Sequence, residues 1–303
     1  MSKCKGCGIT IQNEDSTKVG YSPKVGSKLC ERCFKITNYN YHEKESKIID
    51  NNQIIKGINR KKCATLFLCD ILNLNNNMME IFDVIDKPKA LVITKSDIIP
   101  KNVKLDILKD NINKAFGVEE IFFVSCLNGF GKRNILDYIE KYGKVVFAGP
   151  TSSGKSSLIN YLFETSLTVS NYKNTTQEFI SLKLDEYEVI DAPGFNEDYF
   201  QDSVKQKGYL VPKTVTIKKG YSLAVGNTEI YADKDLNLTL FFPKEVICVT
   251  KKIKGKFDKT IKIDNHSDLV ISNLGFIYFK EEANIFMKTN NYIDIRFSIV
   301  GSK

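Results

Sequence analysis

Apolar runs alternate with amphipathic stretches over residues 62–149 of the chain. Four runs are apolar almost throughout, at residues 64–70, 90–94, 121–125 and 145–149. The stretches between them, such as 105–116 and 134–142, repeat apolar residues at helical spacing. Strands that are apolar on both faces and alternate with helices are typical of a parallel sheet covered by helices. The pattern therefore predicts an α/β, doubly wound sheet.

The pattern changes after this region. Residues 179–184 and 188–191 are predicted to form two adjacent strands. Further short strands are expected at residues 214–217, 238–242, 246–250, 260–263 and 293–299. Gly, Asn and Asp separate these strands and no helical pattern intervenes, which indicates a mostly β domain. We expect three domains, at residues 1–45, 46–207 and 208–303.

The first domain contains two pairs of cysteines, Cys4 with Cys7 and Cys30 with Cys33. Each pair has the CxxC spacing with which a zinc ion is commonly held, and four thiolates make a closed structural site. We therefore predict a zinc finger that holds Zn²⁺ through these four residues. The other four cysteines lie among apolar neighbours and are expected to be small core residues.

Composition narrows the class of protein. The chain has 303 residues, 42% hydrophobic and 26% charged, which is enough apolar material for packed domains. No apolar run reaches the roughly 20 residues of a membrane span, and the first residues lack a signal peptide's apolar stretch. We expect a cytoplasmic protein with no membrane partner. The net charge is +8, and most of the excess lies beyond residue 206, which favours an anionic partner unless it reflects a lysine-rich genome.

The strongest motif is a glycine-rich loop, GPTSSGKS, between a predicted strand and a predicted helix. It matches GxxxxGK[ST], in which backbone N–H groups surround phosphates at a helix N-terminus. Lys155 is expected to reach the β- and γ-phosphates, and the Ser156 hydroxyl to ligate Mg²⁺. The residues expected to contact the nucleotide here are Gly149, Thr151, Ser152, Ser153, Gly154, Lys155, Ser156 and Ser157.

A second motif, DAPG, ends a predicted strand about 35 residues after the loop. Asp191 is expected to lie beside Mg²⁺ and help to hold it, and Gly194 is expected to contact the γ-phosphate. Between the two motifs lie two threonines, of which Thr176 is favoured to complete the Mg²⁺ shell. Lys155, Thr176 and Gly194 are thus the expected catalytic residues.

Two further motifs precede the loop. TKSD, with Thr94, Lys95 and Asp97, ends one predicted strand, and Ser125 with Cys126 ends the next. A carboxylate can accept hydrogen bonds from N1–H and the amine of guanine, which adenine does not offer. Asp97 is therefore expected to select GTP over ATP, and Ser125-Cys126 to contact guanine O6.

These motifs resemble those of small GTPase-like proteins but appear in the order G4-G5-G1-G2-G3, which is a circular permutation. The whole arrangement resembles the YqeH-type circularly permuted GTPases. The resemblance rests on the cysteine pairs, residues 68–71 (LCDI), residues 91–100 (LVITKSDIIP), the P-loop, DAPG and residues 218–226 (KKGYSLAVG). It implies a GTPase acting in assembly of the small ribosomal subunit, bound to ribosomal RNA through its C-terminal domain.

The chain departs from this family at three positions. Thr94 stands where Asn is usual, and a threonine can still hydrogen-bond to the loop. Ser152 also replaces an Asn that helps to hold potassium, so dependence on K⁺ is left open. Ala192 replaces a more common threonine.

Phe195 follows DAPG at the position where many GTPases have a glutamine that orients water. We therefore expect slow hydrolysis of GTP that a macromolecular partner accelerates. Residues 251–262 carry six lysines and are the expected RNA contact, or else a solvated hairpin. The alternative function is a zinc-containing RNA-binding module with little turnover; the oligomeric state is left open.

Overall fold

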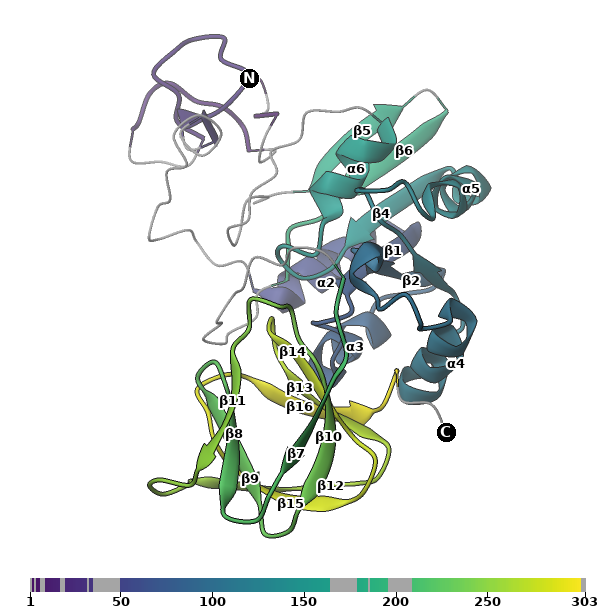
Figure 1. The fold of residues 1–303 in the computed structure, drawn as a ribbon. Coiled ribbons are helices and arrows are strands. Elements are labelled where there is room, and N and C mark those ends of the chain that lie inside the picture. The colour runs from purple at the N-terminus through teal and green to yellow at the C-terminus, as the bar shows by residue number, and fades with distance from the viewer. Residues whose placement is uncertain are drawn as a thin grey trace. The chain divides into compact units, whose positions relative to one another are not determined.

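The structure is a computed structural model of the chain. It describes residues 2, 4–5, 9–16, 20–31, 33–34, 50–163, 179–184, 186–195 and 209–300. The chain divides into two compact units (Figure 1). Unit one contains residues 1–69, 81–95 and 120–197, and unit two contains residues 70–80, 96–119 and 198–303.

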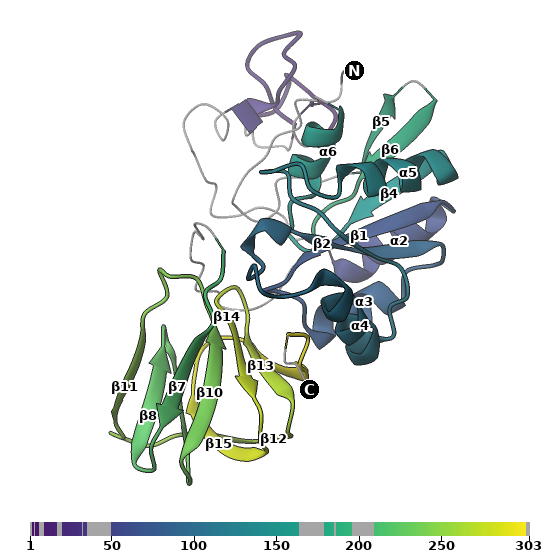
Figure 2. The ribbon, with the colours of Figure 1, turned by 45° about the vertical axis from the view of Figure 1, so that its right-hand side comes forward.

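Unit one is organised around a six-stranded sheet in the order β3-β2-β1-β4-β6-β5. Figure 2 shows β2, β1, β4, β6 and β5 of this sheet. The strands are β1 (Ala64–Asp70), β2 (Lys89–Thr94), β3 (Ile121–Phe123), β4 (Lys144–Ala148), β5 (Ile180–Leu184) and β6 (Tyr187–Asp191). β1 pairs with β4, β2 with β3 and β4 with β6 in parallel, whereas β5 runs antiparallel to β6 at the edge. The prediction of a doubly wound α/β sheet is confirmed, with one antiparallel edge strand.

The helices follow the strands in the alternation that the sequence predicts. They are α2 (Asn51–Arg60), α3 (Asn76–Asp83), α4 (Leu105–Phe116), α5 (Lys132–Tyr142) and α6 (Lys155–Phe163), with the short 3-10 helix η1 (Ser96–Ile98) after β2. α4 ends at Gly117, whose φ of 67° is the left-handed cap conformation that glycine favours. Buried residues of α5 and α6 pack with the sheet's apolar strands into one core. Among the described residues, every helix is too short or too polar to span a membrane.

The C-terminal part of unit two forms two five-stranded sheets, in the orders β16-β13-β14-β10-β7 and β11-β8-β9-β15-β12. The strands are β7 (Lys213–Ile217), β8 (Tyr221–Val225), β9 (Thr228–Ala232), β10 (Leu236–Phe241), β11 (Cys248–Lys252), β12 (Lys259–Ile263), β13 (Ser267–Ile271), β14 (Gly275–Phe279), β15 (Ala283–Lys288) and β16 (Ile293–Phe297). Within residues 209–300 the structure has no helix, so the prediction of a mostly β domain is confirmed.

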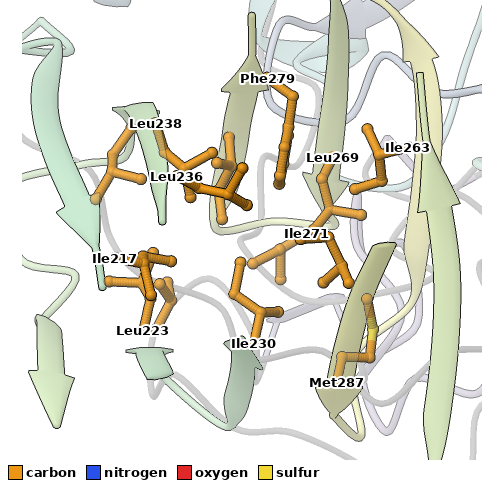
Figure 3. Packing of buried hydrophobic residues seen from close by; sticks show 14 of the residues in the cluster. Ile217, Leu223, Ile230, Leu236, Leu238, Ile263, Leu269, Ile271, Phe279 and Met287 are labelled. Carbon is orange, nitrogen blue, oxygen red and sulfur yellow. The ribbon is translucent and has the colours of Figure 1, made fainter. Parts of the chain in front are cut away.

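Side chains from both sheets meet in a single apolar core (Figure 3). Along β9 and β15, buried residues alternate with more exposed ones, because successive side chains of a strand point to opposite faces. Leu223, Ile230, Ile271 and Met287 are among the buried residues that fill this core.

Unit two also includes two segments from the first half of the sequence, residues 70–80 and 96–119. The backbone N–H of Asn76 donates to Asp294 Oδ2 at 2.6 Å, and the Asn111 amide donates to the Ile299 carbonyl at 3.1 Å. The Leu210 N–H donates to the Ile98 carbonyl at 2.7 Å. Segments 70–80 and 96–119 thus supply polar partners to β16, to the residues just after it, and to the segment before β7. The domain boundaries expected from the sequence stay a prediction.

Candidate functional site

A glycine-rich loop joins the end of β4 to the first turn of α6. Gly149 and Gly154 have φ angles of 142° and 93°, and a side chain on Gly149 would collide with the Leu68 carbonyl. Ser152, exposed, has a φ of 65°. These positive φ angles turn the backbone through a tight loop directly before the N-terminus of a helix, where anions bind. Ser153 is buried in this loop, and Ser157 lies half-buried in the first turn of α6.

Lys155 is the first residue of α6 and is 6% exposed. Its ammonium donates to the Gly149 carbonyl at 3.0 Å and to the Pro150 carbonyl at 2.8 Å. Burial lowers the pKa of Lys155 to about 8, although the nearby charge of Asp191 acts in the opposite direction. The cation is therefore held by the carbonyl groups of the loop itself.

Asp191, at the end of β6, lies beside the loop's helix. The Ser156 hydroxyl donates to Asp191 Oδ2 at 2.9 Å, so the structure brings these two predicted Mg²⁺ ligands together. A hydroxyl and a carboxylate are hard oxygen ligands, which suit Mg²⁺. The residues present therefore fit the ion. Thr176, the third predicted ligand, lies outside the described residues.

The DAPG segment packs directly against the loop. A side chain on Gly194 would come within 2.6 Å of the Thr151 methyl group and 2.9 Å of its Cα atom. The Thr151 N–H donates to the Phe195 carbonyl, and the Phe195 N–H to the Gly149 carbonyl, each at 3.1 Å. The glycine at position 194 thus permits the close approach of two segments that the sequence separates by about 40 residues.

Phe195 is fully buried and packs against Phe67, with ring centroids 5.9 Å apart. Its side chain is apolar and removed from solvent, so it cannot orient a water molecule. Phe67 is a neighbour of the site that the sequence analysis did not single out, because a buried phenylalanine in a strand carries no motif.

The Thr94 hydroxyl donates to the Ser153 carbonyl at 2.8 Å, which ties the end of β2 to the P-loop. Lys95 follows in the left-handed region, with a φ of 52°. Ser125 is buried, and its hydroxyl accepts from the Leu127 N–H at 3.2 Å, whereas Cys126 is exposed. Asp97 lies half-buried in η1, in the other compact unit.

Three of the four predicted zinc ligands lie together. The Sγ atoms of Cys4, Cys30 and Cys33 are all within 4.8 Å of one another, and the three residues are buried. The Cys30 N–H also donates to Cys4 Sγ at 3.2 Å, a bond typical of thiolate clusters around a metal. Three convergent thiols fit Zn²⁺, and Cys7 lies outside the described residues.

Comparison with known proteins supports the class of this site. A family model described as "50S ribosome-binding GTPase" matches residues 144–252. YqeH of Bacillus subtilis is 34% identical over 213 residues, which cover 63% of this chain and 58% of YqeH. GTPase Der of Borrelia garinii is 27% identical over 203 residues, 56% of this chain and 45% of Der. The small ribosomal subunit biogenesis GTPase RsgA of Prochlorococcus marinus is 29% identical over 134 residues, 41% of this chain and 42% of RsgA. The chain spans about half the length of these relatives.

The parallel sheet, the P-loop and the matched family model define the chain as a P-loop protein with a GTPase fold. In the permuted order of its motifs and in sequence, the chain is similar to YqeH, a resemblance to the YqeH-type circularly permuted GTPases. The resemblance seen in the motifs is therefore confirmed.

Proposed function

We propose that the protein binds GTP and hydrolyses it slowly to GDP and phosphate, as a switch in the cytoplasmic assembly of the small ribosomal subunit. The observation that carries this proposal is the placement of Lys155, Ser156 and Asp191 around one glycine-rich loop. A buried cation and a pair of oxygen ligands at a helix N-terminus are what a magnesium-bound triphosphate needs.

The roles of the chain's residues in hydrolysis follow from this placement. Lys155 exchanges the two loop carbonyls for phosphate oxygens of the β- and γ-phosphates. Ser156 and Asp191, with Thr176, would hold Mg²⁺, which supplies a positive charge that offsets the charge developing on the phosphates. The Gly194 N–H contacts the γ-phosphate. Water then attacks the γ-phosphorus in line, and the bond to the bridging oxygen of GDP breaks.

The slow rate is proposed from Phe195. In many GTPases the residue here orients the attacking water, but this side chain is buried against Phe67. Turnover by the free protein is therefore expected to lack that contribution, and a bound partner is expected to supply it.

Guanine selection is assigned to Asp97, with Thr94, Lys95, Ser125 and Cys126 shaping the base site. Thr94 supports this role, because its bond to Ser153 joins the TKSD motif to the P-loop. Zn²⁺ is assigned to the four cysteines of the N-terminal domain, and ribosomal RNA of the small subunit is the proposed partner. The positive charge beyond residue 206 supports the RNA assignment, and the similarity to the small ribosomal subunit biogenesis GTPase RsgA supports a role at that subunit.

The decisive experiment compares GTP, ATP and XTP binding by the purified protein and by Asp97→Asn. We expect the wild type to prefer GTP over ATP by more than 100-fold, and the variant to lose GTP and gain XTP, because the amide reverses the hydrogen-bond pattern. Equal binding of GTP and ATP would overturn the proposal. GTP binding with no turnover, even on addition of small subunits, would instead favour the alternative of an RNA-binding module with little hydrolysis.

A further inference from the structure

The β strands of unit two line a small pocket, open to solvent, at the turn between β8 and β9. Its volume is about 170 Å³. We call it the β8–β9 pocket, and its polar lining comes from Asn227, Thr228, Glu229, Lys251, Lys288 and Asn290. Small-molecule sites usually measure about 300–1,000 Å³, so this pocket fits one chemical group of a larger ligand.

The floor of the pocket is polar, and its side chains are joined by hydrogen bonds. Thr228 is buried, and its hydroxyl lies 2.6 Å from the Thr289 hydroxyl. The Asn291 amide donates to the Thr228 hydroxyl at 3.0 Å, and the Asn291 N–H donates to the Thr289 hydroxyl at 3.0 Å. A hydrogen-bonded network of this kind fixes the shape of the pocket before a ligand arrives.

The pocket carries a positive charge in excess. Glu229 accepts from the Ser222 hydroxyl at 2.6 Å and forms an ion pair with Lys251 at 2.9 Å. Burial alone would raise the pKa of Glu229, but these two hydrogen bonds and the charges of Lys251 and Lys288 lower it. Its carboxylate is therefore ionised and offsets one of the two lysine charges, so the pocket keeps a net positive charge that favours an anion at the exposed Lys288.

Aromatic side chains lie next to the pocket on the same face of the sheet. Lys288 pairs with Glu229 across β15 and β9, and Phe286 pairs with Tyr231 two residues further along. The Phe286 and Tyr231 rings stack at 4.7 Å with an interplanar angle of 14°. Phe257 meets Tyr231 edge-on at 4.5 Å. All three rings are half-buried, so each keeps some surface toward solvent.

The spacing between the charges and the rings is set by the strands. Two residues of a strand span roughly 7 Å. A phosphate and the base of an adjoining nucleotide in a flexible single strand can bridge such a distance. A cationic groove combined with aromatic rings is the usual design of a site for single-stranded nucleic acid.

We propose that the β8–β9 pocket and the neighbouring rings bind single-stranded RNA. A phosphodiester lies at Lys288 and the pocket's amide groups, and an adjacent base lies against Phe286 and Tyr231. This site rests on the RNA partner of the proposed function and gives it a location. It shares Lys251 and Phe257 with the lysine-rich stretch at residues 251–262, but Lys288, Phe286 and Tyr231 come from other strands.

The test measures binding of a fluorescein-labelled single-stranded RNA 12-mer of mixed sequence to the full chain, by anisotropy, from 50 to 200 mM salt. Lys288→Ala is expected to weaken binding about 5-fold or more and to reduce the slope of log affinity against log salt by about 0.7, which is one phosphate contact. Phe286→Leu is expected to weaken binding at least 5-fold with the slope unchanged, because it removes stacking rather than charge.

The matched control is Lys234→Ala, which removes another exposed lysine, beyond the other end of β9. It is expected to change affinity less than 2-fold. If Phe286→Leu does not fold, as judged by circular dichroism, Lys288→Glu replaces it and is expected to weaken binding more than Lys288→Ala.

The outcomes separate the site from the function. If the wild type binds RNA and Lys288→Ala behaves like Lys234→Ala, the proposed site is wrong and RNA binds elsewhere. If the wild type binds GTP but no RNA, the RNA partner of the proposed function is wrong, and the site with it. If Lys288→Ala weakens binding of a polyglutamate peptide and leaves RNA binding unchanged, the pocket is a protein contact and the proposal is overturned.

Discussion

Among the residues that the structure describes, each of the two units buries one cation, and the two cations are held in different ways. Lys155 of unit one is 6% exposed and donates to two backbone carbonyls of its own loop. Arg296 of unit two is 3% exposed and forms an ion pair with the buried Asp268 at 3.3 Å. Arg296 also donates to the Leu74 carbonyl, and its guanidinium lies 4.9 Å from the centre of the Phe276 ring.

The difference separates a cation that is available to a ligand from one that is part of the fold. Carbonyl oxygens are neutral, so an incoming phosphate can replace them and gain a stronger, charge-assisted bond with Lys155. Arg296 already has a carboxylate partner, a carbonyl acceptor and an aromatic face. In this chain, the buried cation whose hydrogen bonds go to exchangeable carbonyl groups is therefore the one placed to bind a ligand.

The largest expected effect comes from removing the structural cation. Arg296→Met leaves Asp268 buried without its partner and is expected to lower the free energy of unfolding by about 3–5 kcal/mol. Urea unfolding followed by circular dichroism measures it. The double variant with Asp268→Leu is the control and is expected to recover most of the loss, because a buried pair is often replaceable by apolar groups. A loss below about 1 kcal/mol for Arg296→Met would contradict the structural role.

Removing the other cation is expected to act on the ligand. Lys155→Met is expected to weaken GTP binding about 100-fold or more, since the charge-assisted contacts to the phosphates are lost, and to leave the free energy of unfolding equal or higher. Titration with a fluorescent GTP analogue gives the affinity, and urea unfolding gives the stability. If Lys155→Met instead unfolds the protein while ligand binding per folded molecule persists, the comparison between the two cations fails.

Because the pKa of Lys155 is lowered, the affinity for GTP is expected to depend on pH. Below about pH 8 the lysine is charged in the free and the bound protein, and affinity for GTP is expected to be constant. Above pH 8 the free protein must take up a proton on binding, so affinity falls toward tenfold per pH unit. Binding measured from pH 7 to 9 tests this, and Lys155→Met is expected to show no such fall.

The stability of the free protein is expected to change in the opposite sense. A lysine has an ordinary pKa of 10.5, so between pH 8 and 10.5 the unfolded chain binds more protons than the folded one. The cost of burying the charge is fully present below pH 8 and is relieved as the pH rises through this window. Stability that falls from pH 8 to 9 in the wild type relative to Lys155→Met would contradict the assignment.

The smallest effect concerns the loop itself. Ser152 has a left-handed φ of 65°, a conformation that asparagine tolerates better than serine. Ser152→Asn is expected to raise stability by a few tenths of a kcal/mol, measured by thermal unfolding without nucleotide. Gly26→Asn, at an exposed left-handed turn position outside the glycine-rich loop, serves as the control and is expected not to raise stability, because glycine already tolerates this conformation.

Much of unit one was predictable because its signals are local. The apolar runs at residues 64–70 and 145–149 became β1 and β4, and the glycine motif between a strand and a helix identified the phosphate loop. The strand predicted at residues 121–125 proved shorter, since β3 ends at Phe123. The contact of Gly194 with Thr151 was not predictable in detail, because it depends on how two loops approach.

Unit two was less predictable because its chemistry is assembled by strand pairing. Strands β8, β9, β13, β14 and β15 were not identified from the sequence, although strands flanking them were. Lys288 meets Glu229 only because β15 pairs with β9. Arg296 and Leu74 belong to no motif, and their contact joins positions 222 residues apart.

That last contact has a consequence for the order in which the protein matures during synthesis. Leu74 leaves the translating ribosome long before Arg296. During synthesis the Leu74 carbonyl therefore lacks its native Arg296 donor. This contact forms only when β16, which carries Arg296, has been synthesised. Pairings between distant positions form slowly and leave intermediates open to aggregation, so a nascent chain arrested before residue 293 should need a chaperone where the finished chain does not.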